Sequence, residues 1–108
     1  MRVHEEIVIE GTDLTTGAIS SVFQLEHILG YSVSILYTGS SSQMATKVTL
    51  EVTTNDEDWF EYYVFELTGT SDSCLINATD VFYKAARFKL EPEQGSISPT
   101  FTVYKKGM

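Results

Sequence analysis

Two stretches in which apolar and polar residues alternate constrain the fold of this chain most. In residues 31–39, YSVSILYTG, the odd positions up to 37 carry tyrosine, valine or isoleucine, and most even positions carry serine or threonine. In residues 47–54, KVTLEVTT, the even positions up to 52 carry valine or leucine. Successive side chains of a β-strand point to opposite faces of the sheet, so each stretch predicts a strand with one buried face. A second layer must therefore cover that face.

Six further segments have strand-like composition and are separated by turn residues, as in GTDLTTG at 11–17. They are residues 5–10, 18–25, 60–67, 73–77, 85–91 and 98–106. About eight short, evenly spaced strands are typical of an all-β, two-sheet antiparallel sandwich, and we expect a jelly-roll-like one. A length of 108 residues suits one core, so we expect residues 1–108 to form a single β-sandwich domain.

Two segments could instead contain a helical turn. QLEHILGY at 24–31 has leucines and an isoleucine at helical spacing, but we interpret it as a short turn between strands. ATDVFYKAA at 78–86 could hold one helical turn capped by Thr79 or Asp80.

The alternation also predicts which side chains form the core. We expect nine to be largely buried: Val33, Ile35, Val48, Leu50, Val52, Phe88, Leu90, Phe101 and Val103. The single cysteine, Cys74, cannot form an internal disulfide, and we interpret it as a small buried apolar residue.

Charge and composition exclude several classes of function. The formal net charge of −8 repels phosphate backbones and anionic lipids, so we expect neither nucleic acid nor a membrane as a partner. The first residues, MRVHEEIVIEG, lack the apolar run of a secretory signal, and we expect a soluble protein made in the cytoplasm of its host cell. With one cysteine and two histidines, the chain lacks the ligands of a zinc centre.

The most conspicuous polar stretch is TTNDEDWFEYYVF, residues 53–65, which we predict to contain a hairpin loop. Asp56 and Asp58 could bind calcium, but the third ligand, glycine and distal glutamate of an EF-hand loop are missing, so a solvated acidic turn is favoured. Trp59 is expected to face the core, with an exposed sugar-stacking surface as the alternative. These residues form our candidate ligand or loop site together with Arg87, which either faces solvent or pairs with Asp80 or Asp58.

No catalytic constellation is visible in the sequence. A hydrolase needs a nucleophile next to a base, or two facing carboxylates, and neither arrangement can be identified. His27, in a predicted turn, is interpreted as structural. We therefore expect a protein that is not an enzyme and carries no cofactor.

Short motifs nevertheless resemble a group of small β-sandwich proteins encoded in the structural regions of tailed bacteriophages. That group has a "gyS" strand, a "v.S.D...W" hairpin, a "y.y.R" strand and a final strand ending in "kG". The chain departs from it at Thr53 and Thr54, where the group has serine. The matching residues, spread over about 20–107, are Gly30, Tyr31, Ser32, Val52, Asp56 or Asp58, Trp59, Tyr83, Arg87 and Gly107.

The resemblance implies a virion structural protein, such as a module of a tail fibre, a tail or neck attachment, or a capsid decoration. It implies other virion proteins as partners, self-assembly with a trimer as first choice, and location in the virion after synthesis in the host cytoplasm. Several such folds resemble jelly-roll modules that bind carbohydrate, so recognition of a host-surface glycan is the alternative. Exposed aromatic residues beside polar groups would favour a glycan, whereas an apolar patch rimmed by polar residues would favour assembly.

Overall fold

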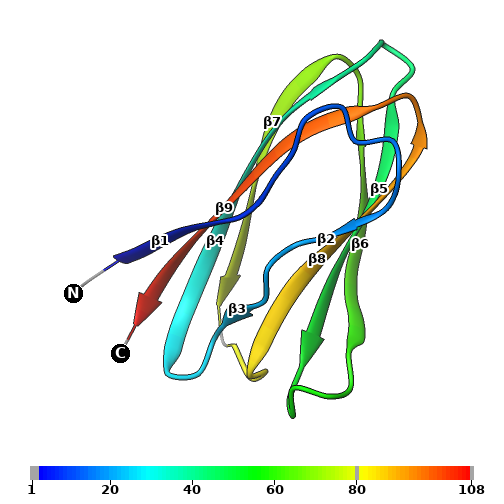
Figure 1. Cartoon of the computed structure of the whole chain (residues 1–108). Coiled ribbons are helices and arrows are strands. Elements are labelled where there is room, and N and C mark those ends of the chain that lie inside the picture. The colour runs from blue at the N-terminus through cyan, green and yellow to red at the C-terminus, as the bar shows by residue number, and fades with distance from the viewer. Residues whose placement is uncertain (1–2, 80, 108) are drawn as a thin grey trace.

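The structure is a computed structural model that describes residues 3–79 and 81–107, and it confirms the predicted fold. Nine strands of this part of the chain form two antiparallel sheets that pack face to face as a jelly-roll-like sandwich (Figure 1). The strands are β1 (Val3–Glu10), β2 (Ala18–Ile19), β3 (Phe23–Gln24), β4 (Ile28–Gly39), β5 (Ala45–Thr53), β6 (Phe60–Thr68), β7 (Ser71–Thr79), β8 (Ala85–Gln94) and β9 (Ile97–Gly107). Within the described ranges, no helix is long and apolar enough to cross a membrane.

Each sheet combines strands that are distant in sequence. The first sheet has the order β1-β9-β4-β7, and the second has the order β2-β8-β5-β6, with β3 also paired to β8. The chain passes from one sheet to the other six times: between β1 and β2, β3 and β4, β4 and β5, β6 and β7, β7 and β8, and β8 and β9. As a result β6 and β7, which are joined by a short turn, are edge strands of different sheets.

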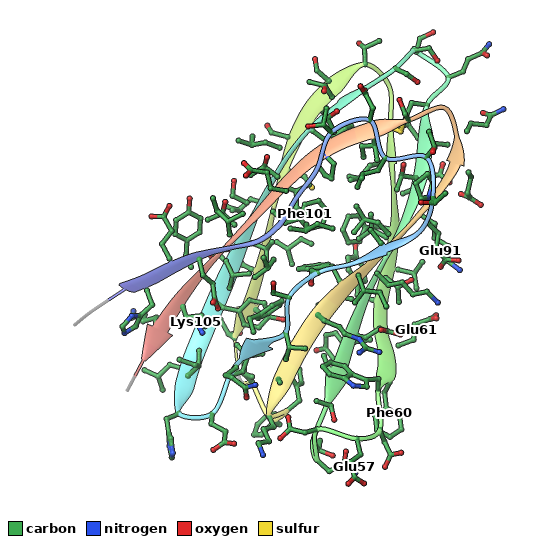
Figure 2. All side chains as sticks on the ribbon, in the orientation of Figure 1. Glu57, Phe60, Glu61, Glu91, Phe101 and Lys105 are labelled. Atoms are coloured by element: carbon green, nitrogen blue, oxygen red, sulfur yellow. The ribbon has the colours of Figure 1, made fainter. Side chains whose placement is uncertain are left out.

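The core lies between the sheets, and all nine side chains predicted to form it are buried. Its centre is aromatic: the rings of Phe88 and Phe101 meet edge to face at 5.1 Å, and Phe23 stacks on Phe88 at 5.9 Å. Figure 2 shows Phe101 between the two layers. Burial of an aromatic side chain removes roughly 150 to 250 Å² from water, so this cluster is a main source of stability.

The predicted strand at 18–25 is interrupted, because the chain here connects the two sheets. Ser20 bonds to Phe88 of β8 in the second sheet through both its N–H and its hydroxyl. The next N–H, of Ser21, donates to the carbonyl of Val8 on β1 in the first sheet. This connection closes one side of the sandwich.

Among the residues that the structure describes, neither segment with a helical alternative contains a helix. The segment at 24–31 contains a turn, as interpreted, in which the Ile28 N–H donates to the Leu25 carbonyl and His27 has φ of 62°. In the segment at 78–86, residues 81 and 82 are irregular and residues 83 and 84 form a bend, and the Lys84 N–H donates to the Thr53 carbonyl at the end of β5. Asp80, one of the proposed caps, lies outside the described residues.

Candidate functional site

The acidic stretch forms the β5–β6 hairpin loop, and its own side chains organise it. The Thr53 hydroxyl accepts hydrogen bonds from the N–H groups of Asn55 and Asp56, and the Asn55 side-chain oxygen accepts from those of Glu57 and Asp58. Such local bonds are typical of Asx and ST turns. They explain how Asp56 keeps a left-handed φ of 64°.

Both candidate calcium ligands are engaged by other side chains. The Asp56 carboxylate lies 2.6 Å from Lys84 Nζ, and this contact raises the pKa of the lysine. The Asp58 carboxylate accepts a 2.8 Å hydrogen bond from the Asn55 side-chain nitrogen. Over the described ranges, no group of three histidine, cysteine or acidic residues is arranged to hold a metal ion.

Trp59 and Arg87 contact each other on the outer face of the second sheet. The Arg87 guanidinium lies 4.0 Å from the ring centroid of Trp59, and its Nε donates to the Glu51 carboxylate at 2.9 Å. The expectation that Trp59 faces the core is therefore wrong: the ring is half-buried outside the sandwich, beneath the arginine. The partner of Arg87 is Glu51, its neighbour across the β5–β8 pair, and not Asp58.

The four predicted site residues thus form two separate structural clusters. Asp56 and Asp58 stabilise the hairpin loop, while Trp59 and Arg87 cover the outer face of the sheet. Figure 2 shows the loop end of this hairpin, with Glu57 and Phe60 at the lower end of the molecule.

A more distinctive feature is a groove on the side of the sandwich opposite the Ser21–Val8 connection, which we call the β6–β7 groove. It consists of two adjoining hollows of ≈ 450 Å³ and ≈ 370 Å³, which share the lining residues Tyr63, Leu75 and Ile76. Residues from both edge strands line it, together with Tyr31, Tyr37 and Leu50 from the strands behind them.

The groove exposes side chains that point toward the interior. The pairing of β7 with β4 places Cys74, Ile76 and Ala78 opposite the buried Ile35, Val33 and Tyr31, and paired residues point to the same face. On β6, Tyr63 pairs with the buried Leu50, yet 52% of Tyr63 is exposed. The core is therefore incomplete along this side.

A bulge and a turn set the geometry of the two walls. Tyr62 is an extra residue in β6, because the pairing steps from Leu50–Tyr63 to Glu51–Glu61. At the other end, Gly69 has φ of 92°, which favours glycine, and its carbonyl lies so close to Gly39 that a Cβ there would clash with it.

Tyrosine hydroxyls close both ends of the groove. At one end Tyr37 donates to the Thr68 carbonyl at 2.8 Å, and at the other the hydroxyls of Tyr31 and Tyr83 lie 2.9 Å apart. The Tyr62 ring packs edge to face on Tyr83 at 5.3 Å. Burial raises the pKa of Tyr31 far above its ordinary value, and the hydrogen bond to Tyr83 adds to this effect.

The interpretation of Cys74 as a buried residue is wrong. Its position points inward, but the open groove leaves it exposed. Partial desolvation raises the pKa of its thiol, and the nearby Asp72 carboxylate raises it further. At neutral pH the thiol is therefore protonated and a weak nucleophile.

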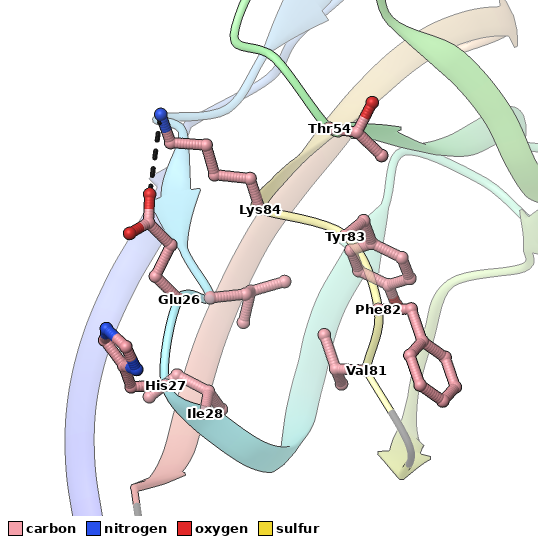
Figure 3. A pocket seen from close by; sticks show the side chains of 9 residues that line it. Glu26, His27, Ile28, Thr54, Val81, Phe82, Tyr83 and Lys84 are labelled. Atoms are coloured by element: carbon pink, nitrogen blue, oxygen red, sulfur yellow. Dashed lines mark ion pairs between the residues drawn. The ribbon is translucent and has the colours of Figure 1, made fainter.

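A third, shallow hollow lies at the loop end of the molecule (Figure 3). Its rim carries Phe82, which is almost fully exposed, and the ion pair of Lys84 with Glu26 at 3.4 Å. The hollow lies between the turn that contains His27 and the chain that leads into β8.

The alternation pattern missed the groove because it assigns a side chain to a face and does not show whether that face is covered. One signal was present: in FEYYVFEL two tyrosines stand side by side, at 62 and 63, where alternation allows one inward position. Adjacent aromatic residues in a strand are compatible with a bulge.

Comparison with known proteins supports the fold. No protein-family model matches the sequence, and the curated proteins contain no match. Among solved structures, the chain is similar to the SPBc2 prophage-derived protein YomS, with a TM-score of 0.58 and 10% identity over 95% of this chain and 93% of that one. It is also similar to a protein of the Bacillus endospore appendages, described as disulfide-linked pili (TM-score 0.59, 10% identity, 98% and 88% covered), and to PirA (0.54, 14%, 95% and 92%). At these identities the likeness establishes a shared small β-sandwich fold.

Proposed function

We propose that this protein is a structural component of a bacteriophage virion, as a module of a tail fibre, a tail or neck attachment or a capsid decoration, and that it acts by binding other proteins. The observation that carries the proposal is the β6–β7 groove, where side chains directed at the core remain open to solvent. Fold likeness to a prophage-derived protein and to an appendage protein supports this class of role.

Large apolar side chains are exposed on the edge strands of the groove and beyond the end of β7. Phe60, Tyr62, Tyr63, Leu75 and Phe82 are each more than half exposed, and they lie on β6, β7 and the segment after β7. Of these, Tyr62, Tyr63 and Leu75 line the β6–β7 groove, and at roughly 100 Å² each they expose roughly 300 Å², a size at which an apolar patch on a monomer is often functional. Surfaces of this kind mark protein interaction sites, and the nearby acidic residues Glu61, Glu66 and Asp72 supply a polar rim.

The chemistry of the groove favours binding over catalysis. Among its lining residues, burial raises the pKa of Tyr31, Tyr37 and Cys74, which keeps these groups protonated near neutral pH. Neither His4 nor His27 is among those residues. We therefore include in the proposal that the protein is not an enzyme and that its partners are proteins, with neither nucleic acid nor membrane bound by a surface of net charge −8.

The proposal is tested by purifying phage particles from cells that carry the gene and measuring the protein in them by quantitative mass spectrometry. We expect it in the particles at a copy number that matches a symmetric structure, and immunogold labelling should place it on the tail or the capsid. Its presence in the host cytoplasm alone, with none in purified particles, would contradict a virion role.

Glycan binding is the second candidate, and one observation favours it. The exposed Phe82 ring lies at the rim of the loop-end hollow, which Lys84 and Glu26 line on the opposite side, and an exposed ring beside a polar hollow can serve as a sugar-stacking surface (Figure 3). A glycan array should then show binding that Phe82→Ala abolishes and that Leu36→Ala, an exposed apolar change on β4, leaves intact. An array without any bound glycan would remove this candidate.

A further inference from the structure

The two sheets have four edges, and three of them carry features that prevent pairing with another chain. β1 has a bulge between Ile7 and Ile9 and a charged sequence, and its Val8 carbonyl is already bonded to Ser21. β2 and β3 are two residues long. β6 has the bulge at Tyr62 and two glutamates. Bulges, charges and short length are the usual protection of edge strands.

The fourth edge, β7, lacks this protection. Its nine residues pair with β4 from Ser71 to Thr79 without a register shift, and its sequence, SDSCLINAT, contains neither proline nor lysine. Asp72 is its only charged residue. A straight, mostly uncharged edge presents a row of backbone N–H and C=O groups that a further strand can bond. It also forms one wall of the β6–β7 groove.

We propose that β7 pairs antiparallel with β7 of a second copy of this chain, so that the first sheets of the two copies become one continuous sheet. This inference rests on the proposed function and names a partner for its binding surface. An antiparallel contact of a strand with itself is two-fold and uses the same patch on both copies, so it closes as a dimer. It takes the place of the trimer expected from the resemblance.

The sequence of β7 is compatible with pairing to itself. All nine residues pair when the two-fold axis passes through the central residue, Leu75, which then faces its own copy. Asp72 faces the uncharged Ala78 of the second copy in this register. The two Asp72 residues then lie six residues apart along the strands, roughly 20 Å, which exceeds the screening length of about 8 Å at physiological salt.

The same contact covers both open grooves. Because β6 and β7 form facing walls of the groove, the edge strands of the second copy are brought against its open side. Tyr63 and Ile76, which point inward, would then lose solvent contact in both copies, while Leu75 would pack on the outer face against Leu75 of the second copy. Each subunit supplies the missing side of the other's core, which gives an apolar interface centre of the kind found in homodimers.

The first measurement is the mass of the purified full chain in solution by light scattering. We expect twice the monomer mass of 12.1 kDa, and a dimer fraction that rises from low to physiological ionic strength, because salt screens the repulsion between subunits of charge −8. A monomer at high concentration throughout this salt range, or a trimer, would overturn the inference.

The second measurement maps the contact with cysteines. Leu75→Cys, made together with Cys74→Ser, should form a disulfide-linked dimer under mild oxidation, since directly opposed residues of antiparallel strands lie within disulfide reach. Leu36→Cys in the same background is the matched control: residue 36 is on the same outer face and similarly exposed, at 54% against 62% for Leu75, but it lies on the inner strand β4. Equal cross-linking of both variants, or of neither, would contradict pairing through β7.

A charge variant separates this inference from the proposed function. Leu75→Lys should convert the dimer to a folded monomer, while Leu36→Lys should leave the dimer intact. A dimer that survives Leu75→Lys uses another surface and refutes the inference. If the wild-type chain is found in purified virions but is monomeric in solution, the virion role stands and self-pairing fails; a dimer that is absent from virions gives the opposite result.

Discussion

Replacing Arg87 by alanine tests how much the outer face of the second sheet contributes to stability. Arg87 stacks on Trp59 and bonds Glu51, whose side chain is only 17% exposed. Loss of the arginine leaves a largely covered carboxylate without its cation, which destabilises the folded state by about 1 to 3 kcal/mol. It also removes a cation–π contact that contributes about 1 kcal/mol. We expect unfolding to become easier by about 2 to 4 kcal/mol.

Urea unfolding followed by far-ultraviolet circular dichroism is the suitable assay, because Trp59 fluorescence itself depends on the substituted residue. The matched control is Lys89→Ala, two residues along β8, where the side chain is 45% exposed and its contact with Glu91 is 4.0 Å long. An exposed pair of this kind contributes about 0.5 kcal/mol or less. If Arg87→Ala and Lys89→Ala lose the same stability, or if the effects of Arg87→Ala and Glu51→Ala simply add, Arg87 and Glu51 are not energetically coupled.

Three further predictions concern the core, the groove and the loop. Leu50→Ala should cost about 2 to 5 kcal/mol in urea unfolding, whereas Leu36→Ala at the surface should cost under about 0.5, and similar losses would contradict the observed register. Because burial raises the pKa of Tyr31 above its ordinary 10.0, only the unfolded state ionises just above pH 10; the melting temperature should fall from there upward, and less steeply in Tyr31→Phe. A chelator should leave the melting temperature unchanged, since the carboxylates of Asp56 and Asp58 are already paired within the protein, and a drop of several degrees would restore the calcium hypothesis.

Side-chain alternation was sufficient to predict the sandwich and its nine core residues, because burial of one strand face is a property of the local sequence. It could not predict the order of strands. β6 and β7 are adjacent in sequence and would ordinarily pair as a hairpin, yet they belong to different sheets. The exposure of Cys74 follows from this separation, and no local pattern around that residue indicates it.

The expectation that Trp59 faces the core is wrong for a different reason. Size and apolar character favour burial of tryptophan, but Arg87 covers the ring from the neighbouring part of the sheet and removes one face from solvent without moving it into the core. The partner Glu51 was equally hard to predict, because the β5–β8 pairing that brings it to Arg87 joins residues 36 positions apart. Contacts between strands cannot be predicted from one sequence when the order of the strands in the sheet is unknown.

The closed side of the sandwich contributes most of the stability of the fold, and the open side carries the proposed binding surface. On the closed side the Ser21–Val8 bond joins the two sheets, and in the core the edge-to-face contact of Phe88 with Phe101, which belong to different sheets, holds them together without any partner. On the open side, Tyr63 and Leu75 contribute little to the isolated chain because they remain in water. Substitutions there should therefore alter association more than folding, and substitutions at Phe88 should do the reverse. A domain with this division can change its partner through the open side while its fold is preserved, which is compatible with the proposed role in assembly.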